Sequence, residues 1–221
     1  MAANIGWPAT YAGGVTDVRS ADIHIDKLQP GEGPEALATL ARAFWPDPLF
    51  GFFAPDPLWE HHALAHGFSA FMADLESFDQ SWVARAGSRV VGAAVWAPPG
   101  AMPRSRRREA MVQARMARIL LTGRNRRRGI ALLNAVDKVH PHEPHWYLAL
   151  LGTDPLVQGR GAGGRLLGPA LDQADNDGTP AYLETQKEQN LAFYARHGFA
   201  VAEEIRLAGS PPVWTMRREP R

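Results

Sequence analysis

The spacing of apolar residues changes several times along this 221-residue chain, between a period of two and a period of three to four. Ile23 and Ile25 are separated by a polar residue, which predicts a first strand. Residues 35–44 carry apolar positions at helical spacing, and a second helix is expected over 58–79. Four prolines between these two helices indicate a loop over residues 46–57.

The rest of the chain alternates strands and helices. The expected elements are a hairpin at 81–96, helices at 106–121 and 130–139, a strand at 146–152, a helix at 161–177, a strand at 181–185, a helix at 190–197 and two strands within 199–216. This order predicts a single α/β domain over residues 21–221, with a mixed sheet and helices on its faces. Residues 1–20 show no periodicity and are expected to form a flexible tail.

Composition limits the class of protein. The chain is 45% hydrophobic and 21% charged, as globular proteins are, and its apolar runs are too short for a membrane-spanning helix. Residues 1–20 lack the basic patch and apolar core of a signal peptide. The absence of cysteine excludes disulfides and thiolate chemistry and fits a cytoplasmic protein. The excess of 21 arginines over 3 lysines favours a GC-rich, bacterial genome.

The net charge of +1 conceals an uneven distribution. Residues 104–128 contain ten arginines and one acid, a charge of +9, so the remaining chain carries −8. Such a segment is most often a solvated helix face, although a basic patch can also attract phosphates. It contains no aromatic residue on which bases could stack, so nucleic acid is not an expected partner.

A glycine-rich turn, Gln158–Gly164, separates a predicted strand from a predicted helix. Its glycines allow close approach of a ligand, and the helix start offers free N–H groups, which suits a pyrophosphate. A purely structural turn is the alternative. The Gly-Lys-Ser/Thr of a P-loop is missing, and no early βαβ unit supports a dinucleotide fingerprint.

The pattern Gln158-x-x-Gly161-x-Gly163 resembles the acetyl-CoA signature of the GCN5-related N-acetyltransferase (GNAT) family. The resemblance continues through residues 182–185 and through 190–199, which look like the family's "N…FY…GF" element. Residues 143–214 are particularly similar to the members that resemble puromycin N-acetyltransferase. The resemblance implies a GNAT-like domain with a mostly antiparallel, twisted sheet and an acetyl-CoA-dependent N-acetyltransferase activity.

The resemblance also implies which residues hold acetyl-CoA. The backbone of one strand end would pair with the pantetheine amides and polarise the thioester carbonyl, and the turn would hold the pyrophosphate. The residues concerned are Leu151, Gly152 and Thr153 on the strand, and Gln158, Gly159, Arg160, Gly161, Ala162 and Gly163 in the turn. Asn190 would contact the pantetheine or position the next helix, and a plain helix cap is its alternative role.

Two residues are implied in the chemistry. Tyr194 would protonate the leaving thiolate, since an ordinary phenol keeps its proton at neutral pH. Glu184 would take a proton from the amine, directly or through a water. Each has an alternative: Tyr194 packs the last helix on the sheet, and Glu184 pairs with an arginine or only binds the acceptor ammonium.

Histidines and aromatic residues provide weaker signals. The chain has no metal motif, so no metal is expected at the two histidine groups, His62 with His66 and His140 with His142 and His145. One group of aromatic residues belongs either to the core or to an acceptor pocket: Trp45, Phe50, Phe52, Phe53 and Trp59.

Three functions therefore compete. The first is acetyl transfer to a primary amine or hydrazide of a small, aromatic or drug-like molecule. The second is acetylation of a protein lysine or N-terminus, and the third is a non-catalytic, acyl-CoA-binding regulatory module. The expected partners are a small amine or a protein lysine, with no nucleic acid and no membrane, in a monomer or homodimer.

Overall fold

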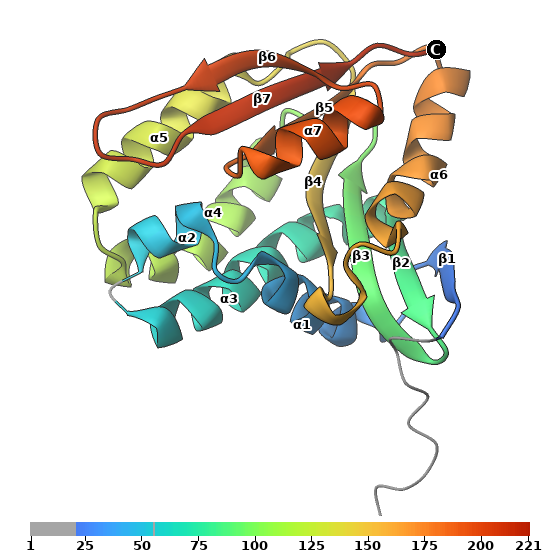
Figure 1. Cartoon of the computed structure of the whole chain (residues 1–221). Helices are drawn as coiled ribbons and strands as arrows, with labels where there is room; N and C mark the ends of the chain where they lie inside the picture. The colour runs from blue at the N-terminus through green and yellow to red at the C-terminus, as the bar shows by residue number, and fades with distance from the viewer. Residues whose placement is uncertain (1–20, 55) are drawn as a thin grey trace, which may run out of the picture.

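The computed structural model describes residues 21–54 and 56–221, so the predicted tail at 1–20 lies outside it (Figure 1). The described residues form a seven-stranded sheet in the order β1-β2-β3-β4-β5-β7-β6. The strands are β1 (Ile23–Lys27), β2 (Ser81–Ala86), β3 (Arg89–Ala97), β4 (Trp146–Thr153), β5 (Ala181–Thr185), β6 (Ala200–Ile205) and β7 (Val213–Arg218). Only β4 and β5 pair in parallel, which confirms the predicted mixed, mostly antiparallel sheet.

Helices cover both faces of this sheet. They are α1 (Gly33–Phe44), α2 (Pro48–Phe53), α3 (Pro57–Leu75), α4 (Arg106–Thr122), α5 (Arg126–Val139), α6 (Ala162–Asn176) and α7 (Gln189–Arg196), with short 3₁₀ turns η2 (Glu76–Phe78) and η3 (Pro155–Val157). On one face α1 and α3 pack against β3, and α6 packs on the opposite face (Figure 1). No helix of the described residues is long and apolar enough to cross a membrane.

The two faces have separate hydrophobic cores because neighbouring residues of a strand point to opposite sides. Val95 of β3 is buried with Leu40 of α1 and Phe68 of α3. The next residue, Trp96, is buried in the other core with Leu166 of α6. The central strands are therefore apolar on both faces, as their unbroken apolar sequences require.

The strand β4 contains a bulge at the point where it leaves β5. Trp96 of β3 pairs with Leu148, but the preceding Val95 pairs with Leu150, so Ala149 is an extra residue in β4. The parallel pairing of β4 with β5 runs from Trp146 to Leu148. Because a bulge bends its strand and increases the local twist, it turns the second half of β4 away from β5.

The loop predicted over residues 46–57 is partly wrong, because it contains the helix α2 and the start of α3. Pro48 and Pro57 occupy the first turns of these helices, where a missing N–H costs nothing. The Asp47 carboxylate accepts hydrogen bonds from the amides of Leu49 and Phe50, and Asp56 caps α3 in the same way. The prolines therefore begin helices here rather than interrupting them.

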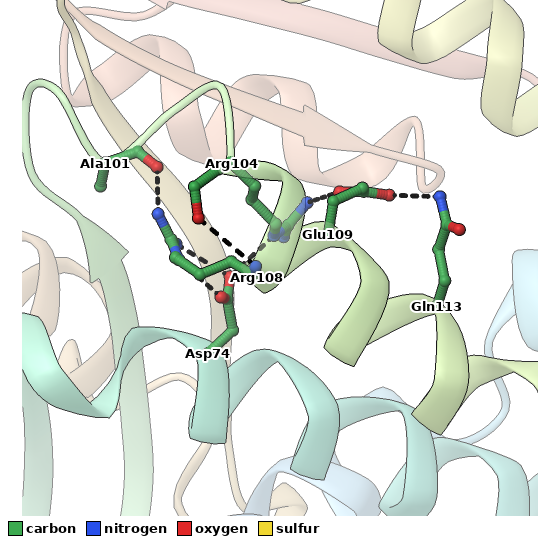
Figure 2. Close-up of polar contacts among 7 residues, drawn as sticks. Asp74, Ala101, Arg104, Arg108, Glu109 and Gln113 are labelled. Carbon is green, nitrogen blue, oxygen red and sulfur yellow. Dashed lines mark hydrogen bonds and ion pairs between the residues drawn. The ribbon is translucent and has the colours of Figure 1, made fainter.

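The basic segment is divided between a structural part and an exposed part. The side chain of Asp74 in α3, 3% exposed, accepts from Arg104 at 2.7 Å and from Arg108 at 2.8 and 3.0 Å, which fastens the start of α4 to α3 (Figure 2). Arg108 also donates to the Ala101 carbonyl at 2.6 Å. Arg106 and Arg107 are exposed, as expected for a solvated face.

We expect Asp74→Asn to destabilise the fold by about 2–3 kcal/mol, since hydrogen bonds to charged groups contribute roughly 1.5–3 kcal/mol. Burial opposes ionisation of Asp74, but the two arginines outweigh it and lower the pKa of its carboxyl. Because that pKa is lowered, this stabilisation is present above about pH 4 and is lost as the pH falls further. Urea unfolding at several pH values measures it. The exposed double variant Arg106→Gln/Arg107→Gln is the control and should unfold like the wild type.

Candidate active site

A single cavity of about 880 Å³ runs from the opening between β4 and β5 to the helices above it. The strands β4 and β5 line its middle, the turn before α6 and the start of α6 line one part, and α1, α2, α3, α5, α7 and the start of β7 also contribute. Eleven of the twelve residues singled out from the sequence line it; they are Leu151, Gly152, Thr153, Gln158, Gly159, Gly161, Ala162, Gly163, Glu184, Asn190 and Tyr194.

The glycine-rich turn forms a tight loop at the start of α6. Gly159 and Gly161 have φ values of +78° and +77°, a conformation that side chains with a Cβ rarely adopt. A Cβ at either position would meet no atom within 4 Å, so the space beside the turn is open. The first N–H groups of α6 have no partner within the helix. This open cradle of amides fits a pyrophosphate, the group that the sequence predicts there.

The second half of β4 has no strand partner on the side facing β5, since the β4–β5 pairing ends at Leu148, and the Thr153 carbonyl accepts from the Gln158 side chain at 3.1 Å. Leu151, Gly152 and Thr153 remain paired with β3 on their other side. A Cβ on Gly152 would lie 2.8 Å from the Cβ of Ala43, so this glycine also allows α1 to approach the strand. The free strand edge fits the amides of a pantetheine arm.

The other two predicted cofactor residues differ in position. Arg160 does not line the cavity, and its guanidinium donates to the carbonyl of Ala21 at 2.6 Å. Asn190 does line it, and its side chain donates to the Thr185 hydroxyl at 3.0 Å, which joins α7 to the end of β5. Because Glu188 is the N-cap of α7, Asn190 is not a helix cap.

Tyr194 combines packing with access to the cavity. Its side chain is 7% exposed, and its ring makes edge contacts with Phe193 and Phe199. Burial raises the pKa of its hydroxyl above the ordinary value. The group therefore stays protonated at neutral pH and can act as a proton donor.

Glu184, near the end of β5, has a side chain that is 9% exposed. Its Oε1 lies 3.2 Å from Nδ1 of His140, so its partner is a histidine and not the arginine considered from the sequence. The Tyr147 hydroxyl is its neighbour: burial and the Glu184 carboxylate raise the pKa of Tyr147 well above the ordinary range. Sequence reasoning did not find these contacts, which join residues far apart in the chain.

The part of the cavity formed by the helices is apolar. Its aromatic and aliphatic lining comes from the helical residues Phe44, Leu49, Phe50, Phe68, Phe71, Leu132, Leu133 and Val136, and the strand residues Tyr147 and Val213 adjoin it. Of the five aromatic residues considered from the sequence, Phe50 alone lines it, while Trp45 is 49% exposed and Phe53 belongs to the core. Phe44, Phe68 and Phe71 were not singled out, because their helical spacing is equally typical of core residues.

Carboxylates are few in this cavity. Asp47 and Glu184 are the acidic residues of its lining within the described chain, and Asp47 is engaged in capping α2. Burial raises the pKa of Asp47. Among residues 21–54 and 56–221, no group of three or more histidine or acidic side chains is placed to hold a metal ion.

Comparison with known proteins agrees with this geometry. Residues 37–199 match the model of the acetyltransferase (GNAT) family. An uncharacterized N-acetyltransferase of Schizosaccharomyces pombe is 32% identical over 88 residues, which are 38% of this chain and 36% of that protein. The chain thus matches little more than a third of the length of this curated relative.

Solved structures share the fold at low identity. A structure of Corynebacterium glutamicum, described as histone acetyltransferase HPA2 and related acetyltransferase, is 23% identical with a TM-score of 0.65, over 90% of this chain and 97% of that one. A polyamine N-acetyltransferase of Drosophila melanogaster is 19% identical with a TM-score of 0.63, over 90% of this chain and 100% of that one. The family match, which covers most of the chain, shows that this protein belongs to the acetyltransferase (GNAT) family.

Proposed function

We propose that this enzyme acetylates the primary amine of a small molecule whose body is apolar or aromatic and carries a single positive charge. The observation that supports this most directly is the lining of the cavity, which has eight apolar or aromatic residues from helices, Tyr147 and Val213 from strands, and Glu184 beside them. A polyamine would bring a second charge into this apolar surface, where burial of an unpaired charge is unfavourable.

The residues assigned to acetyl-CoA follow from the shape of the site. Acetyl-CoA supplies the acetyl group as a thioester. We assign its pyrophosphate to the amides of Gly159, Gly161 and Gly163, and its pantetheine arm to the free edge of β4 at Leu151–Thr153. A backbone N–H of this edge then polarises the thioester carbonyl and stabilises the oxyanion that forms on attack.

Two side chains move the protons. The ammonium of the acceptor loses a proton to Glu184, and the neutral amine attacks the acetyl carbon. The sulfur leaves with the electron pair of the broken carbon–sulfur bond and takes a proton from the Tyr194 hydroxyl. Both side chains line the same cavity, one from β5 and the other from α7.

The first prediction concerns acetyl-CoA binding. Gly161→Val places a branched side chain in the open space beside the turn, and we expect affinity to fall at least tenfold, or about 1.4 kcal/mol. Gly178→Val is the matched control, since Gly178 also has a positive φ (+61°) and open space but does not line the cavity. Calorimetry on both folded variants measures the effect, and equal affinities would contradict the placement of the pyrophosphate.

The second prediction concerns the proton donor. Tyr194→Phe keeps the ring contacts and removes the hydroxyl, so we expect kcat to fall by roughly 10²–10⁴, the range for general acid catalysis. Affinity for acetyl-CoA should stay the same, because the proton moves only in the transition state. Steady-state kinetics and calorimetry separate the two effects. Wild-type turnover by this variant would remove Tyr194 from the mechanism.

The third prediction concerns the acceptor. We expect phenylethylamine to be acetylated with a kcat/KM roughly thirtyfold above that of ethylamine, since burying a phenyl ring contributes about 2 kcal/mol. For agmatine and a lysine peptide, kcat/KM should be lower than for ethylamine. A panel of these four amines measures the preference, and a preference for the peptide would favour protein acetylation. Acetyl-CoA binding without turnover of any amine would favour a non-catalytic binding module.

The same panel can test the wall of the pocket. Leu133 of α5 lines the cavity and is 38% exposed, so Leu133→Asp should fold and raise the KM for phenylethylamine about tenfold. Ile130 lies on the same helix, is 42% exposed and does not line the cavity, so Ile130→Asp is the matched control. An unchanged KM in both variants would place the acceptor elsewhere.

A further inference from the structure

Two histidines connect Glu184 to the backbone before β4. Nδ1 of His140 lies 3.2 Å from Oε1 of Glu184, and Nε2 of His140 lies 3.2 Å from Nε2 of His145. Nδ1 of His145 lies 2.8 Å from the carbonyl oxygen of Glu143. The three side chains therefore form a continuous chain of hydrogen bonds that begins in the cavity and ends at a fixed backbone acceptor.

This fixed end determines the position of each proton. A carbonyl oxygen can only accept, so Nδ1 of His145 carries a hydrogen and donates it to Glu143. Burial lowers the pKa of His145, which keeps its ring neutral, so its Nε2 has a free lone pair. Nε2 of His140 must then carry a hydrogen and donate it to His145. The remaining nitrogen, Nδ1 of His140, faces Glu184, and their hydrogen bond needs one proton, which either the nitrogen or the carboxyl oxygen can carry.

The surroundings shield this pair from bulk water. The His140 side chain is 12% exposed and that of Glu184 is 9% exposed. The rings of Tyr147 and Tyr182 each stand edge-on to His140, with centroids 4.9 Å away. The titratable groups packed around His140 are thus His145, Tyr147, Tyr182 and Glu184, while Arg104 and Glu203 act more weakly on the two tyrosines. Burial raises the pKa of both tyrosines, so they stay neutral.

We propose that His140 is the positioning residue and proton partner of Glu184, with His145 fixing the tautomer that makes this possible. The inference rests on the proposed function of Glu184 as the base. The N–H bond of the acceptor ammonium breaks as the Glu184 O–H bond forms. That O–H bond then breaks as a proton is bound at Nδ1 of His140, which leaves an imidazolium beside a carboxylate. Release of this proton to solvent restores the pair, and Nε2 of His140 keeps its hydrogen throughout.

Histidine is suited to this position because its charge changes near neutral pH, whereas an arginine would hold the carboxylate permanently paired. A carboxylate alone is a weak base toward an ammonium. When a carboxylate shares a proton with an imidazole, the two groups bind that proton together. The proton affinity is then a property of the pair and not of either group alone. The second histidine matters because it keeps the lone pair of His140 turned toward Glu184.

A kinetic experiment tests the proton partner. In the wild type, kcat/KM for phenylethylamine should show a limb that rises with pH and reports deprotonation of the Glu184–His140 pair. His140→Asn can still donate an N–H to Glu184 but cannot take a proton. We expect its kcat to fall about ten- to a hundredfold, within the usual contribution of proton transfer, and this ascending limb to disappear.

The KM for the amine should change less than about twofold in His140→Asn, because the carboxylate stays in place. His142→Asn is the matched control, since His142 is an exposed histidine of the same loop and its side chain is not a member of the hydrogen-bond chain. It should keep the wild-type rate and profile. An unchanged ascending limb in His140→Asn, even with a lower rate, would overturn the proposal. The contact between His140 and Glu184 would then have a structural role only.

A second measurement needs no turnover. Nitrogen-15 spectra of the histidine rings should show His145 as the neutral Nδ1–H tautomer and His140 with a titration that shifts in Glu184→Gln. Detection of the Nε2–H tautomer at His145, or identical titration of His140 in both proteins, would overturn the inference. If these spectra agree with expectation while no amine is acetylated, the proposed function fails and the proton pair stands.

Discussion

Beyond Leu148, β4 keeps its hydrogen bonds to β3 while its pairing with β5 has ended. Backbone groups along such an edge need partners from a strand, a side chain, water or a ligand, and the Gln158 side chain donates to one of them, the Thr153 carbonyl. The bulge at Ala149 produces this divergence, because it bends β4 at the last residue paired with β5. The cavity, the free strand edge and the access to Glu184 all depend on this one irregularity in the sheet.

Most of the fold could be predicted from local patterns, because the elements concerned carry a clear period. The apolar stripe of α6 and the hairpin of β2 and β3 lie where the sequence indicates. The exception is α2. The prolines of this segment were interpreted as helix breakers, although Pro48 directly follows the capping residue Asp47. The bulge at Ala149 carries no local signal, since it arises from pairing between strands far apart in sequence.

The candidate site also has parts that could be predicted from local sequence and parts that could not. The turn at Gln158–Gly164 could be identified from sequence because close approach of a ligand requires glycines at adjacent positions. The partner of Glu184 could not, because His140 precedes it by 44 residues and no periodicity relates the two. Arg160 illustrates the converse error: a cation in the right segment was assumed to face the ligand, whereas its guanidinium binds the Ala21 carbonyl.

Acid and base differ in this cavity through their surroundings rather than through their residue types alone. Tyr194 is enclosed by rings that offer no charge, so burial alone acts on it and favours its neutral, proton-bearing form. Glu184 is equally enclosed, but an imidazole faces its carboxylate and can share a proton with it. Two groups of similar burial thereby meet different surroundings, uncharged rings at Tyr194 and an imidazole at Glu184, which is how one cavity can separate a proton donor from a proton acceptor.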